Sequence, residues 1–174
     1  MPRTATEIYY CRMRCRLGTL LLAAADQGLR RLQLDGEAPK PAADELWIES
    51  RNRLRDYEEQ LHDYLLGNLR HFTCMLDPVG TEFQKRCWEA LCTIPYGETR
   101  SYADIAKQIG APRAFRAVGQ ANHANPIAII IPCHRVIGSG GGLTGYGGGL
   151  KMKEELLRLE SAALHGSFQF AAAI

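Results

Sequence analysis

The apolar run Ile127-Ala128-Ile129-Ile130-Ile131, stopped at once by Pro132, is the stretch that most restricts how this chain can fold. A short, continuous run of branched apolar residues is typical of a buried β-strand. Proline has no N–H for a sheet ladder and favours extended geometry in the residue before it, so we expect the strand to end at Ile131. The next two residues, Cys133 and His134, would then lie just past the end of a buried strand.

Cys133 and His134 place a thiol beside an imidazole, with Arg135 following. A free thiol has a pKa near ~8.5, so a nucleophilic cysteine needs a base or a positive charge nearby. Neighbouring side chains of a strand point to opposite faces, so the pair cooperates only if the chain turns at Pro132 or a water links the two groups. On these residues alone, a packed thiol beside a satisfied core histidine is the commoner outcome, and a zinc site would need ligands spaced further apart.

The composition is that of an ordinary globular protein, with 46% hydrophobic and 23% charged residues in a chain of 174. No long apolar run and no basic-then-apolar leader occurs, because the N-terminus continues directly into Thr4-Ala5-Thr6-Glu7. We therefore expect a soluble, cytoplasmic protein with no membrane partner. The net charge of +2 does not by itself indicate a polyanionic partner, although residues 100–135 hold five basic residues against one acid.

The six cysteines are scattered along the chain and, without export signals, are interpreted as reduced thiols rather than as disulfides. Cys11 and Cys15 share a face if their segment is a strand, and with His62 or His71 they offer an alternative structural zinc site. Two packed thiols are the commoner outcome. We expect neither a metal nor another cofactor.

Residues 7–35 carry alternating and β-branched stretches that are broken at Leu17-Gly18 and at Asp26-Gln27-Gly28. This pattern predicts a small antiparallel meander of about three strands. From about Asp44 to Leu66 the apolar residues follow helical spacing, and Gly67 is well placed to end the helix. The predicted apolar face consists of Leu54, Tyr57, Leu61, Tyr64 and Leu65. The N-terminal part is therefore predicted to be a sheet with a covering helix.

The segment Asp77-Pro78-Val79-Gly80 indicates a domain boundary, which divides the chain into residues 1–78 and 79–174. Thr81 and Gln84 then form a capping box, typical of the start of a helix. The apolar face of this predicted helix consists of Phe83, Cys87, Trp88 and Leu91.

A helix-turn-helix is predicted next. Ser101 can cap a helix that runs to about Ile109, Gly110 ends it, and Pro112 opens a second helix that runs to about Asn122. The second helix is unusually smooth, which suits either close packing inside the protein or close approach to a partner. Its small residues are Ala114, Ala117, Gly119 and Ala121.

The glycine-rich stretch 138–149 is not a phosphate-binding loop, because it lacks the Gly-Lys-Ser/Thr ending. A flexible loop at the edge of a pocket, with Tyr146 as its one ring, fits better. A last helix is predicted from Lys151 to Leu159, with Glu160 at its end and residues 161–174 as a loosely held tail.

Taken together, these motifs closely resemble the O6-alkylguanine-DNA alkyltransferases. The resemblance spans roughly Thr81 to Glu160, whereas residues 1–78 match only by their meander-plus-helix pattern. It is carried by the following motifs: the helix with Phe83 and Trp88, Ile94-Pro95-Tyr96-Gly97-Glu98, Ser101-Tyr102, Arg116-Ala117-Val118-Gly119, Asn125-Pro126, Pro132-Cys133-His134-Arg135-Val136, and Gly145-Tyr146-Gly147-Gly148. It implies an α+β chain with a ribonuclease H-like N-terminal domain, a small antiparallel sheet with a helix, and a helical, winged helix-turn-helix-like C-terminal domain.

The resemblance also implies a chemistry. An alkyl group would pass irreversibly from O6 of a guanine flipped out of duplex DNA to Cys133, after which the protein is spent. His134, acting through a water and oriented by Glu160, would take the thiol proton, and Asn125 would fix the turn that carries the site.

On the DNA side, the resemblance makes Arg116 the finger that fills the space left by the flipped base. Tyr102 would distort the backbone and hydrogen-bond N3 of guanine. The remaining positions implied to contact the lesion or the DNA are Ala117, Arg135, Val136, Tyr146, Gly147 and Gly148. Other family members carry serine or alanine at position 147, so only backbone chemistry is expected from Gly147.

Two rival functions and a third possibility remain at this point. Alkyltransferase-like damage sensors bind DNA without turnover but lack the nucleophile, so Cys133 favours transfer. A cysteine hydrolase would need no basic, smooth helix, and a fused transcriptional activator would need a further module that the remaining residues do not provide. We expect a monomer; the range of alkyl groups accepted and activity on O4-alkylthymine stay open.

Overall fold

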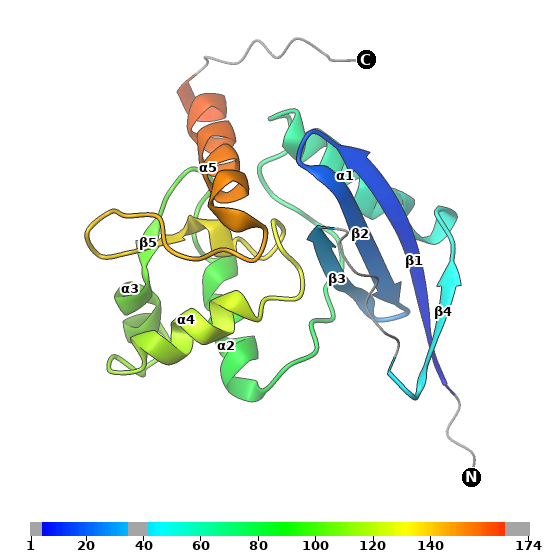
Figure 1. Ribbon diagram of the computed structural model, residues 1–174, viewed down its shortest axis with the longest axis horizontal. Helices are drawn as coiled ribbons and strands as arrows, with labels where there is room; N and C mark the ends of the chain where they lie inside the picture. Colours follow the sequence, from blue (N-terminus) through cyan, green and yellow to red (C-terminus); the bar gives the residue numbers. More distant parts are fainter. Residues whose placement is uncertain (1–4, 35–41, 166–174) are drawn as a thin grey trace.

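The computed structural model describes residues 5–34 and 42–165, which form two lobes joined by an extended segment (Figure 1). The N-terminal lobe is a four-stranded sheet with a helix across it. The C-terminal lobe is built from helices around a two-stranded ladder. The predicted α+β class is confirmed. None of the helices within the described ranges has the length and apolar character needed to cross a membrane.

The sheet has the strand order β3-β2-β1-β4. Strands β1 (Thr6–Cys15), β2 (Gly18–Ala25) and β3 (Gly28–Leu34) form the predicted antiparallel meander, and its turns fall where the glycine signals placed them. The central strand β2 is buried continuously from Leu20 to Ala24. Its unbroken apolar sequence follows from this position, because both faces of a central strand are covered.

Strand β4 (Glu45–Glu49) corrects the prediction of a helix over residues 44–66. It pairs in parallel with the first half of β1, and the ring of Trp47 lies 5.6 Å from that of Tyr10. The helix itself, α1 (Arg55–Leu65), begins about ten residues later than predicted. A short segment takes the strand conformation when an open sheet edge satisfies its backbone, and no local periodicity reports that edge.

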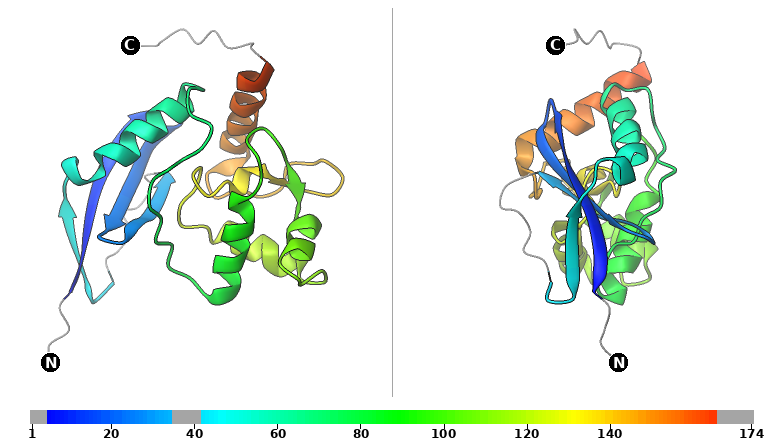
Figure 2. Two further views of the ribbon diagram at one scale, coloured as in Figure 1. Left: turned by 180° about the vertical axis from the view of Figure 1, so that it is seen from behind. Right: turned by 90° about the vertical axis from the view of Figure 1, so that its right-hand side faces the viewer.

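The covering helix α1 follows a short 3-10 turn, η1 (Asn52–Leu54), and lies across one face of the sheet (Figure 2). It buries Leu61 and Tyr64 completely. Gly67, with a φ of 78°, ends this region as predicted, because its N–H turns back to the carbonyl of Tyr64.

Helix α2 (Glu82–Cys92) begins at the predicted capping box. The Thr81 side chain accepts from the Gln84 N–H, and the Gln84 side chain accepts from the Thr81 N–H. On its buried face, the indole N–H of Trp88 donates to the carbonyl of Ala121 at 2.8 Å. This bond fixes α2 against the helix that carries Ala121.

Helices α3 (Tyr102–Gln108) and α4 (Phe115–His123) form the predicted pair. Ser101 caps α3, and Gly110 follows it with a φ of 72°. The second helix begins three residues later than predicted, because the backbone after Pro112 forms a turn before it enters the helix. Both helices pack against α2.

The remaining elements surround the Cys-His stretch. Strands β5 (Arg100–Ser101) and β6 (Val136–Ile137) pair in parallel, and the 3-10 turn η2 (Cys133–Arg135) precedes β6. Helix α5 (Gly149–His165) is longer than predicted at both ends. Glu160 therefore lies inside the helix, and the part of the predicted tail after residue 165 lies outside the described residues.

The two lobes meet along β3. The N–H of Leu32 donates to the carbonyl of Pro126 at 2.9 Å, and the carbonyl of Leu32 accepts from the N–H of Ala128 at 2.9 Å. Buried side chains from both lobes form one continuous hydrophobic core. The sheet edge therefore supports the segment that leads to Cys133.

Gly28 lies at a position where an added side chain would meet backbone atoms. Its φ is 144°, and an added Cβ would lie 2.7 Å from the carbonyl oxygen of Met75, which accepts from the N–H of Leu29. We predict that Gly28→Ala lowers the free energy of unfolding by roughly 2–4 kcal/mol, because it adds a backbone clash to an unfavourable φ.

The matched control is Gly110→Ala, where φ is 72° but no atom lies within 4 Å of the added Cβ. It should cost only about 1 kcal/mol. Urea unfolding of both variants measures the difference, and equal losses would contradict the assigned clash.

Candidate active site

The apolar run before Pro132 is a buried turn, not the strand that we predicted. Ile127 makes an isolated bridge to Leu32, and the chain then turns so that the N–H of Ile131 donates to the carbonyl of Ile127 at 3.1 Å. Ile129, at the centre, has a φ of 73°, which is rare for a β-branched residue. The run is apolar because it is buried, and burial alone does not distinguish a turn from a strand.

Asn125 holds this turn together. Its side-chain N–H donates to the carbonyl of Ile131 at 2.9 Å, and its side-chain oxygen accepts from the N–H of Ile127 at 3.0 Å. The amide thus satisfies backbone groups that a strand would have paired in a ladder. It also explains how a β-branched residue is kept at a positive φ.

The turn delivers Cys133 to the first position of η2, where the side chain is only 4% exposed. The thiol lies at a cavity of about 340 Å³ between the two lobes. Strand β3 contributes one wall, and the 146–148 stretch with α4 and α5 contributes the rest. The lining residues are Leu32, Gln33, Leu34, Asn122, His123, Asn125, Ala128, Cys133, Tyr146, Gly147, Gly148 and Met152.

Burial raises the pKa of the Cys133 thiol above its ordinary value. The Asn125 side chain, the positive charge of Lys153 and the Tyr146 hydroxyl act in the opposite direction but do not reverse this shift. The thiol is therefore protonated at neutral pH, and a base must remove its proton before sulfur can attack. Burial also raises the pKa of each of the other five cysteines, so thiol acidity does not single out Cys133.

His134 supplies that base. Its Nε2 lies 2.8 Å from Oε1 of Glu160, and neither side chain is exposed at all. Because a carboxylate only accepts, the ring proton belongs on Nε2, which leaves Nδ1 with a free lone pair. Burial lowers the pKa of His134, although Glu160 partly offsets it, so the ring is neutral. Nδ1 is buried and has no protein partner. It is therefore free to accept from a water that links it to the thiol.

Glu160 is held by several donors in addition to His134. Arg135 donates to it from Nε at 3.1 and 3.0 Å and from a terminal nitrogen at 2.8 Å, and the N–H of Gly97 donates at 3.0 Å. The pKa of Glu160 is lowered to about 2, because the hydrogen bonds and charges of His134 and Arg135 outweigh the opposing effect of burial.

The location of Arg135 corrects the expectation that this residue contacts DNA. It is only 7% exposed, and its other terminal nitrogen donates to the carbonyl of Ile94 at 2.7 Å. Its guanidinium also lies 5.6 Å from the centre of the Tyr96 ring. Arg135 therefore fixes the carboxylate from inside the protein.

The exposed face of α4 carries Arg116 and Ala117. The Arg116 guanidinium lies 5.7 Å from the centre of the ring of Phe115, which is itself 47% exposed. Tyr102, at the start of α3, is half-buried, and its hydroxyl accepts from the Thr144 hydroxyl at 2.9 Å. An exposed arginine and aromatic ring on a helix with small residues can approach a flat or grooved partner closely.

The 146–148 stretch completes the cavity, and Val136 is buried directly after η2. The Val136 carbonyl accepts from Nζ of Lys153 at 2.6 Å. At Gly148 an added Cβ would meet the sulfur of Met152, so a larger residue there would displace the Met152 side chain from the cavity wall. At Gly147 no atom lies within 4 Å of an added Cβ, so the glycine leaves open space.

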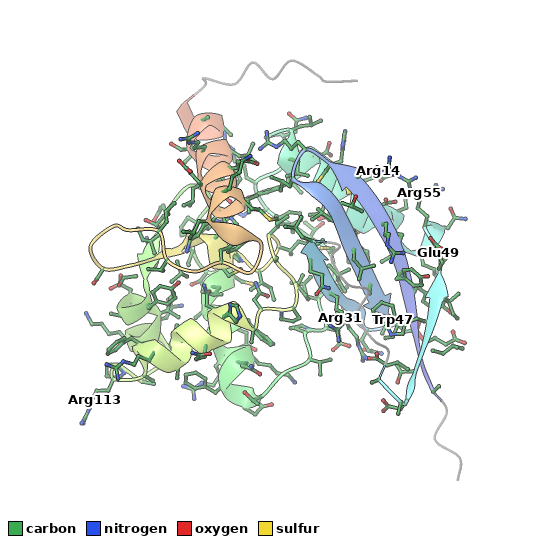
Figure 3. The ribbon with its side chains drawn as sticks, in the orientation of Figure 1. Arg14, Arg31, Trp47, Glu49, Arg55 and Arg113 are labelled. Atoms are coloured by element: carbon green, nitrogen blue, oxygen red, sulfur yellow. The ribbon has the colours of Figure 1, made fainter. Side chains whose placement is uncertain are left out.

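A larger hollow of about 710 Å³ lies in the N-terminal lobe between β1 and α1. Its walls carry arginines, two of which, Arg14 and Arg55, are labelled in Figure 3. It offers no nucleophile, so the cavity at Cys133 is the better candidate for chemistry.

The zinc alternative gains no support from the residues that the structure describes. No group of three or more metal-ligating side chains gathers among them. Burial and the nearby Glu58 carboxylate raise the pKa of Cys11 to about 12, and the Cys15 thiol donates to the carbonyl of Gly18. Among the residues that the structure describes, this thiol pair therefore has no further ligands gathered around it for zinc.

Comparison with known proteins accounts for this arrangement. The family model for the DNA-binding domain of 6-O-methylguanine DNA methyltransferase matches residues 82–162, and the model for the ribonuclease-like domain matches residues 8–90. A methylated-DNA--protein-cysteine methyltransferase of Methanosarcina barkeri is 52% identical over 88% of this chain and 97% of its own. The chain belongs to the O6-methylguanine-DNA methyltransferase family.

Other members of the family agree with this assignment. The enzyme of the same name from Mycobacterium leprae is 51% identical over 87% of this chain and 92% of its own. The crystal structure of the Mycobacterium tuberculosis O6-methylguanine methyltransferase superposes with a TM-score of 0.82 at 48% identity, covering 90% of this chain and 94% of that one. The M. tuberculosis protein in complex with DNA gives a TM-score of 0.80 at 47% identity over the same shares of the two chains.

Three residues at this site are absent from the motifs that carry the family resemblance. Tyr64 donates to Glu160, Lys153 donates to Val136, and the Asn122 side chain donates to the Cys133 carbonyl at 3.3 Å. Tyr64 lay on the predicted apolar face of its helix, so its position indicated burial but not its partner. The signal for Asn122 was a polar residue within the smooth stretch of α4. The signal for Lys153 was a lysine beside the apolar residues of the last helix.

Glu160→Gln tests the ionised carboxylate at the centre of this site. A pKa lowered on folding contributes stability above the unfolded value of 4.5 that is lost as pH falls towards about 2. We therefore predict that the variant is less stable at pH 7 by roughly 3 kcal/mol and that the difference narrows between pH 4.5 and 2.

Glu154→Gln is the matched control on the same helix, because its carboxylate pairs with Arg158 in a largely exposed position. It should change stability by less than ~1 kcal/mol. Urea unfolding at several pH values compares the two variants. A difference for Glu160→Gln that does not vary with pH would contradict the ionised state assigned to the carboxylate.

Proposed function

We propose that this protein repairs DNA by transferring the alkyl group of O6-alkylguanine irreversibly to its own Cys133. The observation that carries the proposal is the buried thiol at a closed-in cavity, followed in the chain by a neutral histidine whose partner is an ionised, buried glutamate. A free Nδ1 on that histidine, without a protein partner, gives the thiol proton a destination.

The proposed reaction begins with proton removal. The Cys133 proton passes through a water to Nδ1 of His134, and the imidazolium that forms is stabilised by Glu160 at 2.8 Å. The thiolate then attacks the alkyl carbon, the carbon–O6 bond breaks, and its electron pair stays on the purine. In this proposal Tyr102 hydrogen-bonds N3 of the leaving base. A thioether is stable in water, so one transfer uses up the protein.

The DNA side of the proposal uses α4. Ala117 is exposed and Gly119 is half-buried, so the helix can approach the DNA backbone closely, and Arg116 occupies the space of the flipped base. The flipped guanine enters the cavity between Tyr146 and the 147–148 backbone. In this proposal the carbonyls of Cys133 and Val136, which already accept from the Asn122 side chain and from Nζ of Lys153, also accept from its exocyclic amine. We also propose that the domain boundary lies between residues 78 and 79.

The presence of Cys133 disfavours a damage sensor that binds without transfer. A monomeric state and a cytoplasmic location stay predictions.

We predict that the intact protein gains the mass of one methyl group, and no more, when it is mixed with duplex DNA containing O6-methylguanine. Cys133→Ala should abolish this gain, because no other thiol shares its neighbours, whereas Cys92→Ala, which removes an exposed thiol, should leave it intact. Intact-mass spectrometry measures the result. An unchanged mass in the unaltered protein, or more repaired base than protein, would sink the proposal.

Arg116→Ala should slow transfer from duplex DNA by at least about tenfold, because the finger no longer fills the vacated stack. Transfer from a single-stranded oligonucleotide, where no base must leave a duplex, should change little. Arg113→Ala is the control, since Arg113 projects from the turn between α3 and α4 at the outside of the lobe (Figure 3). Single-turnover rates on both substrates decide the matter, and equal losses on both would remove the role assigned to Arg116.

A further inference from the structure

We infer that Tyr64 is a positioning residue for alkyl transfer, by which the N-terminal lobe sets the basicity of His134. The inference rests on the proposed function and extends it to a residue outside the C-terminal domain. Tyr64 lies in α1, and its hydroxyl reaches across to two residues that follow it by 70 and 96 positions in the chain.

The contacts of the hydroxyl are short and fully enclosed. Its oxygen lies 2.6 Å from Oε1 of Glu160 and 3.3 Å from Nε2 of His134, and the side chain is completely buried. The phenol has one proton, and Glu160, which is ionised, can only accept it. The hydroxyl oxygen therefore turns its lone pairs towards Nε2–H, so this N–H has two acceptors beside it.

The contact with Nε2 and the orientation of the carboxylate both favour a charged ring. As His134 takes the thiol proton, Nε2–H becomes a stronger donor, and the Tyr64 oxygen stabilises it together with Glu160. Arg135 donates to the carboxylate through three contacts, which favour a position closer to the guanidinium. The hydrogen bond from Tyr64 keeps Oε1 close to His134. Loss of the hydroxyl would make the imidazolium less stable, because both the direct contact and the orientation of the carboxylate would be lost.

One effect acts in the opposite direction. Without the Tyr64 proton, more negative charge stays on the carboxylate, which would favour imidazolium. That charge remains shared with Arg135 and the Gly97 N–H, which keep their bonds, so we expect the loss of the direct contact and of carboxylate orientation to decide the sign.

The other titratable groups around the ring do not replace Tyr64. Lys153 of α5 and Arg135 of η2 are cations that lower the pKa of His134, and Cys133 is its proposed proton donor. Tyr96 packs edge-on against Tyr64 with ring centres 6.0 Å apart, and the Arg70 guanidinium lies over the Tyr96 ring. The hydroxyl of Tyr96 is buried without a partner, so it does not reach the carboxylate.

Tyr64→Phe tests the inference while preserving the ring. We expect the transfer rate on the alkaline plateau to fall about three- to tenfold, because a weaker base removes the thiol proton less readily. We also expect the acid limb of the pH–rate profile, which reports His134, to move to lower pH. A purely structural role would lower the rate without moving this limb.

Tyr57→Phe is the matched control. It removes a hydroxyl from the same helix that donates to the Met75 carbonyl at 3.2 Å, away from the cavity. Its profile should match that of the unaltered protein. Affinity for undamaged duplex DNA should be the same for all three proteins.

A second variant keeps the hydrogen bonds in case the phenylalanine disturbs folding. With 3-fluorotyrosine at position 64 the hydroxyl keeps its bond to Glu160 but is a poorer acceptor for Nε2–H, which makes His134 a weaker base. The acid limb should again move to lower pH, by less than in Tyr64→Phe.

The possible outcomes separate the two proposals. If the unaltered protein gains no methyl group, the proposed function fails. If it transfers normally but both position-64 variants keep its acid limb, or move the limb to higher pH, only the inference about Tyr64 is overturned.

Discussion

The buried carboxylate of Glu160 is the interaction on which the rest of the site depends. An ionised carboxylate is costly to bury unless its oxygens are paired, and here they accept from Tyr64, Gly97, His134 and Arg135. These donors come from α1, the turn after α2, and η2, while Glu160 itself belongs to α5. Satisfying one charge therefore fixes four segments relative to one another, including one from the N-terminal lobe.

The same burial explains why a thiol without unusual acidity can serve as an alkyl acceptor. Cys133 is almost fully enclosed, and its pKa is raised, so the protein at rest carries a thiol and not a thiolate. Reaction then depends on proton transfer to His134 and on a substrate that fills the cavity. Such a site is protected from the adventitious alkylation and oxidation that an exposed thiolate would attract.

The N-terminal lobe is part of the active site and not an appendage to it. Strand β3 lines the cavity and binds the backbone on either side of Ile127, so the turn that carries Cys133 is held from both lobes. Asn125 then closes that turn from within. Precise placement of the sulfur depends on this double support, because a misplaced nucleophile loses much of its reactivity.

The sequence by itself determined the features that depend on neighbouring residues. Turn glycines predicted the meander, and the capping box at Thr81 and the cap at Ser101 predicted the starts of two helices, because capping chemistry is local. The motif around Cys133 indicated the family. Tertiary structure decided the rest: β4 formed where a sheet edge was open, residues 127–131 turned where Asn125 could bind their backbone, and Arg135 folded inwards to Glu160. Tyr64 has no mark in the sequence beyond an apolar spacing, because its partners lie 70 and 96 residues away and only the packed fold brings them together.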